Sequence, residues 1–183
     1  MNSAEETPAQ NPPTETITLT PPTVAQGADL WRLAQGTGVL DTNTPYAYLL
    51  WARDFAETSV IAQVDGEPAG FISGYLTPRD PRTLFIWQVA VDSRFRGRGL
   101  AKKMLFELVQ RTGAERLETT ITADNEASIA LFTALAREHG TQLRREPLFT
   151  TDLFPAREET GEDHAAEDLY TVEPLTHGGS GAV

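Results

Sequence analysis

A strand that runs through a basic, glycine-rich turn into a helix limits the possible folds of this chain more than any other segment. It spans residues 87–105, with the sequence WQVAVDSRFRGRGLAKKML. Gly97 and Gly99 let the backbone approach an anion closely, and the first free N–H groups of the following helix point toward that anion. Five cations lie within ten residues: Arg94, Arg96, Arg98, Lys102 and Lys103. The segment predicts a polyphosphate site, and a solvated basic turn is the alternative interpretation.

This turn matches neither of two common nucleotide-binding motifs. A dinucleotide fingerprint needs glycines spaced GxGxxG, and a P-loop needs GxxxxGK followed by serine or threonine. The chain instead reads Arg94-x-x-Gly97-x-Gly99, and this run follows the apolar residues VAV after two intervening residues. We therefore expect a phosphate-binding turn of another class.

Hydrophobic periodicity predicts helices alternating with strands. Two helices are expected at 28–35, ending at Gly36, and at 45–55, beginning after Thr44 with Pro45. A third is expected at 100–108. A fourth is expected to begin after a capping residue, Asp124 or Asn125, and to end at Gly140. Six strands are expected at 59–64, 69–76, 83–91, 116–121, 148–154 and 169–172, and the first two form a hairpin around Asp65-Gly66. Residues 83–91 are almost wholly apolar, which predicts a central strand buried on both faces. This order indicates a mixed α/β sheet with helices on its faces.

Charge and composition exclude several classes of protein. The chain has 183 residues and a net charge of -11, but residues 17–154, with 14 basic and 16 acidic side chains, carry only -2. A nucleic-acid partner is disfavoured because binding phosphates needs a large basic face. The absence of cysteine excludes a disulfide scaffold, a thiolate-bound metal and a cysteine nucleophile. The three histidines, His139, His164 and His177, lack metal-ligand spacing, so no metal site is predicted.

The ends of the chain differ from its middle. Residues 1–16 are poor in apolar side chains and residues 176–183 are mostly small, so both are expected to be flexible tails around one domain, 17–175. An acidic loop is expected at about 155–168. No apolar run is long enough to cross a bilayer and no secretory signal is evident, so we expect a cytoplasmic protein without a membrane partner.

The glycine-rich turn resembles the pyrophosphate-binding motif of the GCN5-related N-acetyltransferase (GNAT) superfamily. A second segment, DNEASIALF at 124–132, resembles the asparagine-containing motif of the same superfamily. The resemblance implies an acyl-CoA N-acyltransferase fold, with a mixed, mostly antiparallel central sheet and helices on both faces, and acetyl-CoA as cosubstrate. The residues it assigns to the coenzyme are Val89, Val91, Arg94, Arg96, Gly97, Arg98, Gly99, Leu100, Ala101, Asn125, Ser128 and Phe132.

Segments outside these motifs resemble one family within the superfamily, the L-2,4-diaminobutyrate acetyltransferases. They are LDTNTPYAYLL (40–50), GFISGYLTP (70–78), LFIWQVAV (84–91), LETTITADNEAS (117–128) and HAAEDLY (164–170). The resemblance implies a homodimer that acetylates L-2,4-diaminobutyrate at N4, the step that supplies the precursor of ectoine. Two alternatives stay open: an acetyltransferase for another small amine, and a non-enzymatic acyl-CoA-binding module.

The same resemblance places four residues in the diamino-acid pocket. An alkylamine titrates near ~10.4, so a proton must leave the substrate before attack. We expect Asp41 and Glu167 to bind or deprotonate the ammonium, and Tyr46 and Trp87 to shape the pocket and cover the cation. The alternatives are a turn aspartate, a solvated loop charge, and aromatic side chains that only pack.

Two further expectations concern the reaction itself. The exposed edge of the strand at 89–91 could donate a backbone N–H to the developing oxyanion. Many relatives have a tyrosine, proposed to protonate the thiolate, where this chain has Phe132. Water or Tyr48 is the expected proton source instead, because a thiolate with a pKa near ~8.5 leaves without a strong acid.

Overall fold

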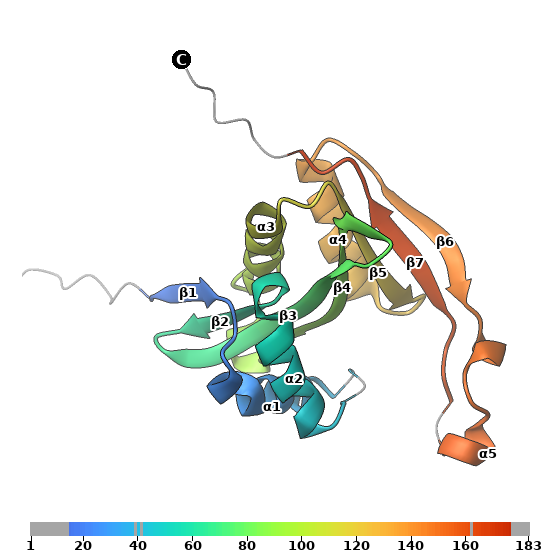
Figure 1. The fold of residues 1–183 in the computed structure, drawn as a ribbon, viewed down its shortest axis with the longest axis horizontal. Coiled ribbons are helices and arrows are strands. Elements are labelled where there is room, and N and C mark those ends of the chain that lie inside the picture. Colours follow the sequence, from blue (N-terminus) through green and yellow to red (C-terminus); the bar gives the residue numbers. More distant parts are fainter. Residues whose placement is uncertain (1–14, 39, 41, 162, 177–183) are drawn as a thin grey trace, which may run out of the picture.

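The computed structural model describes residues 15–38, 40, 42–161 and 163–176, which form one seven-stranded sheet with helices on both faces (Figure 1). The sheet has the order β1-β2-β3-β4-β5-β7-β6. Every neighbouring pair is antiparallel except β4 and β5. The strands are β1 (Ile17–Thr20), β2 (Val60–Val64), β3 (Glu67–Thr77), β4 (Asp80–Val91), β5 (Arg116–Thr122), β6 (Leu143–Phe149) and β7 (Glu167–Val172). The predicted mixed, mostly antiparallel sheet is confirmed.

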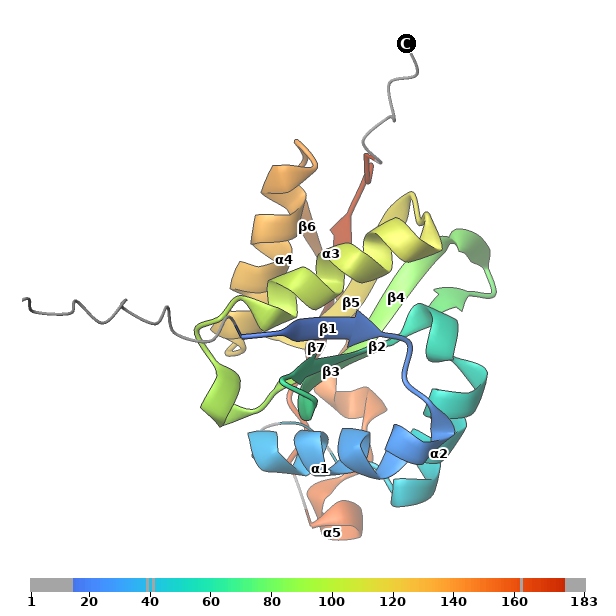
Figure 2. The same ribbon diagram turned by 90° about the vertical axis from the view of Figure 1, so that its left-hand side faces the viewer.

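Two helix pairs cover opposite faces of the sheet (Figure 2). They are α1 (Gly27–Thr37) with α2 (Pro45–Asp54), and α3 (Leu100–Thr112) with α4 (Glu126–Glu138). Met104 and Leu135 are fully buried in the core under α3 and α4, whereas Leu30, Phe71 and Ala90 belong to a separate core under α1 and α2. A short helix, α5 (Arg157–Thr160), lies in the loop between β6 and β7.

Local capping signals correctly marked several helix ends. Thr44, which precedes Pro45, accepts a hydrogen bond from the backbone N–H of Ala47. Asn125 accepts a hydrogen bond from Ser128 N at 3.1 Å. Of the two predicted capping residues of α4, Asn125 is therefore the N-cap. The predicted end of α1 at Gly36 was wrong. The helix continues to Thr37 because the left-handed conformation that terminates it is adopted by Gly38, with φ 66°.

Three strand predictions also need correction. The last strand before the acidic loop is β6 at 143–149, not 148–154, and residues 151–153 form a 3₁₀ turn. β6 is an exposed edge strand with charged side chains, so a prediction based on apolar periodicity does not detect it. The short edge strand β1 was not predicted. The central strand β4 is not buried on both faces, since Trp87 is 36% exposed.

The two middle strands separate at one end. β4 and β5 pair from Thr83↔Arg116 to Ile86↔Thr119, after which β4 runs on to Val91 and β5 to Thr122 without further mutual pairing. Beyond Ile86, therefore, one edge of β4 is left for another partner. No helix in the described part of the chain is both long and apolar enough to cross a membrane.

The predicted flexible tails fall almost entirely outside the described residues. Thr16, the last residue of the predicted N-terminal tail, exchanges hydrogen bonds with Asp65 in the β2–β3 turn. The segment 17–175 contains all seven strands. The domain boundaries stay predictions.

Candidate active site

The glycine-rich turn joins β4 to α3 at the end of the sheet where β4 and β5 separate. Gly97 and Gly99 have φ 80° and 69°, the left-handed region that favours glycine. The first helical hydrogen bond runs from Lys103 N to the Gly99 carbonyl at 3.0 Å, so the N–H groups of residues 100–102 precede it. Phe95 and Leu100 are buried and anchor the turn. The geometry suits an anion, as the sequence predicted.

Carboxylates already engage three of the five cations around this turn. Arg94 pairs with Asp92 at 2.9 Å and Glu67 at 3.3 Å, and its guanidinium holds the pKa of the Asp92 carboxyl below its usual value. The other two pairs are Arg98 with Glu15 and Lys102 with Glu138.

Arg96 and Lys103 are the two cations left over. Neither forms an ion pair with a residue that the structure describes. Arg96 is exposed and lies next to Gly97 in the turn. A bound diphosphate would therefore meet these two side chains without displacing a carboxylate, whereas it would compete with acidic partners for Arg94, Arg98 and Lys102.

The remaining predicted coenzyme residues lie along β4 and α4. Val89 and Val91 are half-buried, on the length of β4 that has no β5 partner. Asn125 and Ser128 form the first turn of α4. Phe132 is 1% exposed within the core under α3 and α4, so its ring supports the helix.

The structure describes three of the four predicted substrate residues, since Asp41 lies outside the described residues. Tyr46 is 67% exposed on α2, and the Trp87 ring stacks on Trp51 of α2 with centroids 4.3 Å apart. Glu167 is half-buried at the start of β7 and pairs with Thr122, the last residue of β5. Because β4 and β5 are parallel, Glu167 lies at the end of the sheet that carries the glycine-rich turn.

Sequence reasoning missed two residues next to Trp87. Trp51 supports its ring, and Gln88, only 4% exposed, accepts a hydrogen bond from the Tyr48 hydroxyl at 3.1 Å. A glutamine inside the apolar run LFIWQVAV was the available signal, because a buried amide needs a polar partner. Tyr48 itself is 2% exposed and its hydroxyl proton is directed to Gln88. This geometry favours water over Tyr48 as the proton source for the thiolate.

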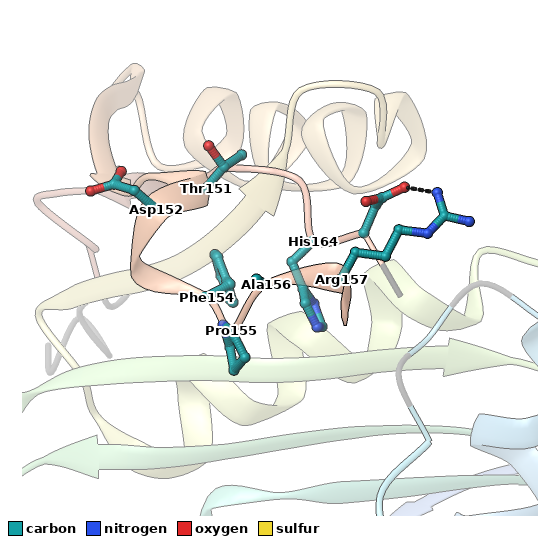
Figure 3. A pocket seen from close by; sticks show the side chains of 8 residues that line it. Thr151, Asp152, Phe154, Pro155, Ala156, Arg157 and His164 are labelled. Carbon is teal, nitrogen blue, oxygen red and sulfur yellow. Dashed lines mark hydrogen bonds and ion pairs between the residues drawn. The ribbon is translucent and has the colours of Figure 1, made fainter. Parts of the chain in front are cut away.

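Two of the hollows on the described surface lie near the segments discussed above. A groove of about 440 Å³ lies beside the glycine-rich turn, between α1 and the residues that include Asp92 and Arg94. A second, of about 330 Å³, lies in the loop between β6 and β7, where the rings of Phe154 and His164 stack 5.1 Å apart (Figure 3). Among the predicted site residues that the structure describes, Arg94 is the one that lines either hollow.

A model of the acetyltransferase (GNAT) family matches residues 27–136, more than half of the chain and the whole of the glycine-rich turn. The chain belongs to the GNAT family. Two bacterial proteins named L-2,4-diaminobutyric acid acetyltransferase resemble it over most of its length. The one from Streptomyces coelicolor is 50% identical over 163 residues, 86% of this chain and 93% of that protein. The one from Nocardia farcinica is 48% identical, covering 87% of this chain and 81% of its own.

A solved structure extends the similarity of this GNAT acetyltransferase to three dimensions. Diaminobutyrate acetyltransferase from Paenibacillus lautus, in complex with L-2,4-diaminobutyric acid and coenzyme A, superimposes with a TM-score of 0.83 at 35% identity. The match covers 90% of this chain and 98% of that one. Within the GNAT family the chain therefore groups with the diaminobutyrate acetyltransferases. The described residues contain no cluster of three histidine, aspartate or glutamate side chains able to hold a metal ion.

Proposed function

We propose that this chain transfers the acetyl group of acetyl-CoA to the 4-amino group of L-2,4-diaminobutyrate. The observation that carries the proposal is the similarity, over 90% of the chain, to a solved enzyme whose complex contains that amino acid and coenzyme A. The local geometry agrees, because an anion-binding turn lies beside the free edge of a split sheet. Both small molecules, rather than nucleic acid or a membrane, are the partners we propose.

The glycine-rich turn and the start of α3 are proposed to hold the diphosphate of the coenzyme. Backbone N–H groups from Gly97 to Ala101 would donate hydrogen bonds, and the positive end of α3 would add a favourable field. Arg96 supplies a cation with no described acidic partner. The edge of β4 at 89–91 would pair with the amides of the pantetheine arm and donate an N–H to the thioester oxygen.

The substrate amine is proposed to meet this thioester from the side of α2 and β7. Trp87 and Tyr46 would cover the cationic amine, and Asp41 and Glu167 would bind the ammonium or accept its proton. The neutral nitrogen attacks the thioester carbon, the C–N bond forms, the C–S bond breaks, and the nitrogen, which is positively charged after attack, releases a proton to water as the amide forms. The coenzyme thiolate then takes a proton from water, because neither Phe132 nor the buried Tyr48 presents a free hydroxyl proton.

Incubation with acetyl-CoA and a panel of amines tests the reaction. We expect thiol release with diaminobutyrate and none with aliphatic diamines, aminoglycosides or peptide N-termini. Nuclear magnetic resonance of the product should place the acetyl group on N4. Release with another amine alone would select a different acetyltransferase, and tight coenzyme binding without release would select a binding module.

We also propose that two copies of the chain associate through apolar residues exposed on α2 and around β6. Apart from Tyr46, which we assign to the amine pocket, the most exposed of these are Leu153, Phe149, Leu148 and Leu49. Burying such side chains against a second copy would remove apolar surface from water. Light scattering should give twice the chain mass, and Leu153→Glu with Phe149→Glu should give single chains. A wild-type protein that is monomeric at high concentration would exclude this arrangement.

In the cell, we propose that the enzyme works in the cytoplasm in ectoine synthesis under osmotic stress. The acidic ends of the chain, which hold most of the net charge, would keep it solvated in a salty interior. Deletion of its gene in the source organism should abolish ectoine accumulation after salt shock, and added N4-acetyl-diaminobutyrate should restore it. Normal accumulation in the deletion strain would contradict this role.

A further inference from the structure

Two consecutive residues of β4 contact the same helix. The Trp87 ring stacks on Trp51, and Gln88 Oε1 accepts the hydrogen bond from Tyr48, so both side chains reach α2. Successive side chains of a regular strand point to opposite faces of the sheet. The register explains the exception, since Ser73 pairs with Gln88 and the next residue of β3 pairs with Ile86. Trp87 is thus the extra residue of a β-bulge, a feature that re-aims side chains beside active sites.

The bulge lies at the point where β4 loses its pairing with β5, one residue after Ile86. Backbone packing on its β3 side is tight, because a Cβ on Gly74 would lie 2.7 Å from the Phe85 carbonyl oxygen and 3.0 Å from that of Thr58. On its other side the bulge is tied to α2. Tyr48 and Gln88 are 2% and 4% exposed, and Tyr48 lies in the apolar core under α1 and α2. A hydrogen bond in such surroundings has one favourable geometry, because its groups have no water to turn to.

We propose that Gln88 is a positioning residue for the amine substrate. Its hydrogen bond with Tyr48 of α2 fixes the bulge against that helix. This bond therefore sets the position of Trp87, on β4, relative to Tyr46, on α2. The two aromatic walls of the pocket come from two different elements, and the Tyr48–Gln88 bond joins those elements. The inference rests on the proposed roles of Trp87 and Tyr46 in amine binding.

Two single variants, with one control, test the bond. Gln88→Met removes the acceptor at nearly constant volume, and Tyr48→Phe removes the donor. Each should raise KM for diaminobutyrate roughly tenfold, because a small misplacement of a pocket wall is costly, while KM for acetyl-CoA changes less than about twofold. The circular dichroism exciton signal of the Trp51–Trp87 pair should weaken in both. Ser73→Ala is the matched control, because Ser73 is buried opposite Gln88 and its hydroxyl has no hydrogen-bond partner among the described residues.

The double variant Gln88→Met/Tyr48→Phe separates positioning from simple stability. Replacing both polar partners by apolar groups of similar shape should recover part of the melting temperature that each single variant loses, since neither end of this hydrogen bond is then left unpaired. It should not restore KM for diaminobutyrate, because an apolar contact does not fix the register. Recovery of both quantities would overturn the inference, and so would single variants that lower only the melting temperature.

Trp87→Ala distinguishes this inference from the function on which it rests. If Trp87→Ala raises KM for diaminobutyrate while Gln88→Met and Tyr48→Phe do not, the positioning role is wrong and the pocket assignment stands. If Trp87→Ala leaves that KM unchanged, the pocket assignment fails and the positioning role fails with it. If one of the single variants does not fold, the other still decides the outcome.

Discussion

Arg98 in the glycine-rich turn is ion-paired with Glu15, which lies two residues before β1. The guanidinium of Arg98 also lies 5.1 Å from the centre of the Phe95 ring. A carboxylate therefore occupies a cation of the turn that we propose binds the coenzyme diphosphate. The two anions must compete for the same guanidinium.

Glu15→Gln should accordingly lower KM for acetyl-CoA. An ion pair at this exposure contributes about 0–1 kcal/mol, so we expect a decrease of at most about fivefold. The turnover number with saturating substrates should not change. Glu115→Gln is the control, because Glu115 pairs with Arg82 at 3.0 Å at the opposite end of β4. An equal or higher KM in Glu15→Gln would show that Arg98 does not contact the coenzyme.

Gly97→Trp should raise KM for acetyl-CoA about tenfold or more and leave KM for diaminobutyrate unchanged. Nothing described lies within 4 Å of a Cβ at Gly97, so an indole would fill the space where the diphosphate should bind. Any side chain at this positive φ also adds backbone strain of about 1–2 kcal/mol, so a control with the same strain but no indole is needed.

Gly97→Ala and Gly113→Ala are the controls for backbone strain. Gly113, at the far end of α3, has φ 63° and equally open surroundings. Both alanine variants should lose about 2–8 °C in melting temperature, since each kcal/mol shifts a domain of this size by about 2–4 °C. If Gly97→Trp changes KM for acetyl-CoA no more than Gly113→Ala does, the diphosphate site lies elsewhere.

Glu167→Gln should reduce kcat/KM for diaminobutyrate about a hundredfold, within the range of a lost proton acceptor. Asp168→Asn is a neighbouring control, because its carboxylate pairs with Arg145 at 2.6 Å and successive residues of β7 face opposite sides of the sheet. Asp41→Asn tests the remaining carboxylate in the same assay. Full activity in both Glu167→Gln and Asp41→Asn would mean that neither residue belongs to the pocket.

Asp92→Asn should lower stability at neutral pH but not in acid. The hydrogen bond from Arg94 depresses the pKa of Asp92 below its ordinary value of 3.8, so the carboxylate is stabilised more in the folded than in the unfolded chain. That contribution is fully present above the unfolded value and is lost as the pH falls through the folded one. Melting temperatures of wild type and variant, recorded from pH 7 downward, should therefore converge below pH 3.8. Curves that stay parallel would contradict the linkage.

Signals that lie next to one another in the chain predicted much of the fold. The Asp65-Gly66 hairpin, the cap at Asn125 and the glycine-rich turn each depend on a few consecutive residues, and each was found. β1 and β6 were missed or misplaced because edge strands are defined by which strand they pair with. Local sequence does not record that choice.

The candidate site divides in the same way. The residues assigned to the coenzyme fall in two short motifs, so a resemblance between sequences suffices to assign them, and the assignment stays a prediction. Trp51 and Gln88 were missed. The glutamine in an apolar run indicates only that Gln88 needs a polar partner, whereas the place of both residues beside Trp87 depends on a bulge that brings Trp87 and Gln88 to one helix. A one-residue irregularity in pairing register has no pattern of its own in the amino-acid sequence.

The separation of β4 from β5 after Ile86 interrupts the sheet at that end. The pantetheine arm, which we propose binds there, carries two amide groups and would supply in that interval hydrogen bonds that a continuous sheet has. Amide protons of residues 87–91 should exchange with deuterated water more slowly once coenzyme is added. Bound coenzyme would then unfold together with the sheet that it completes. The thermal stability of the catalytic domain would therefore rise with the concentration of coenzyme.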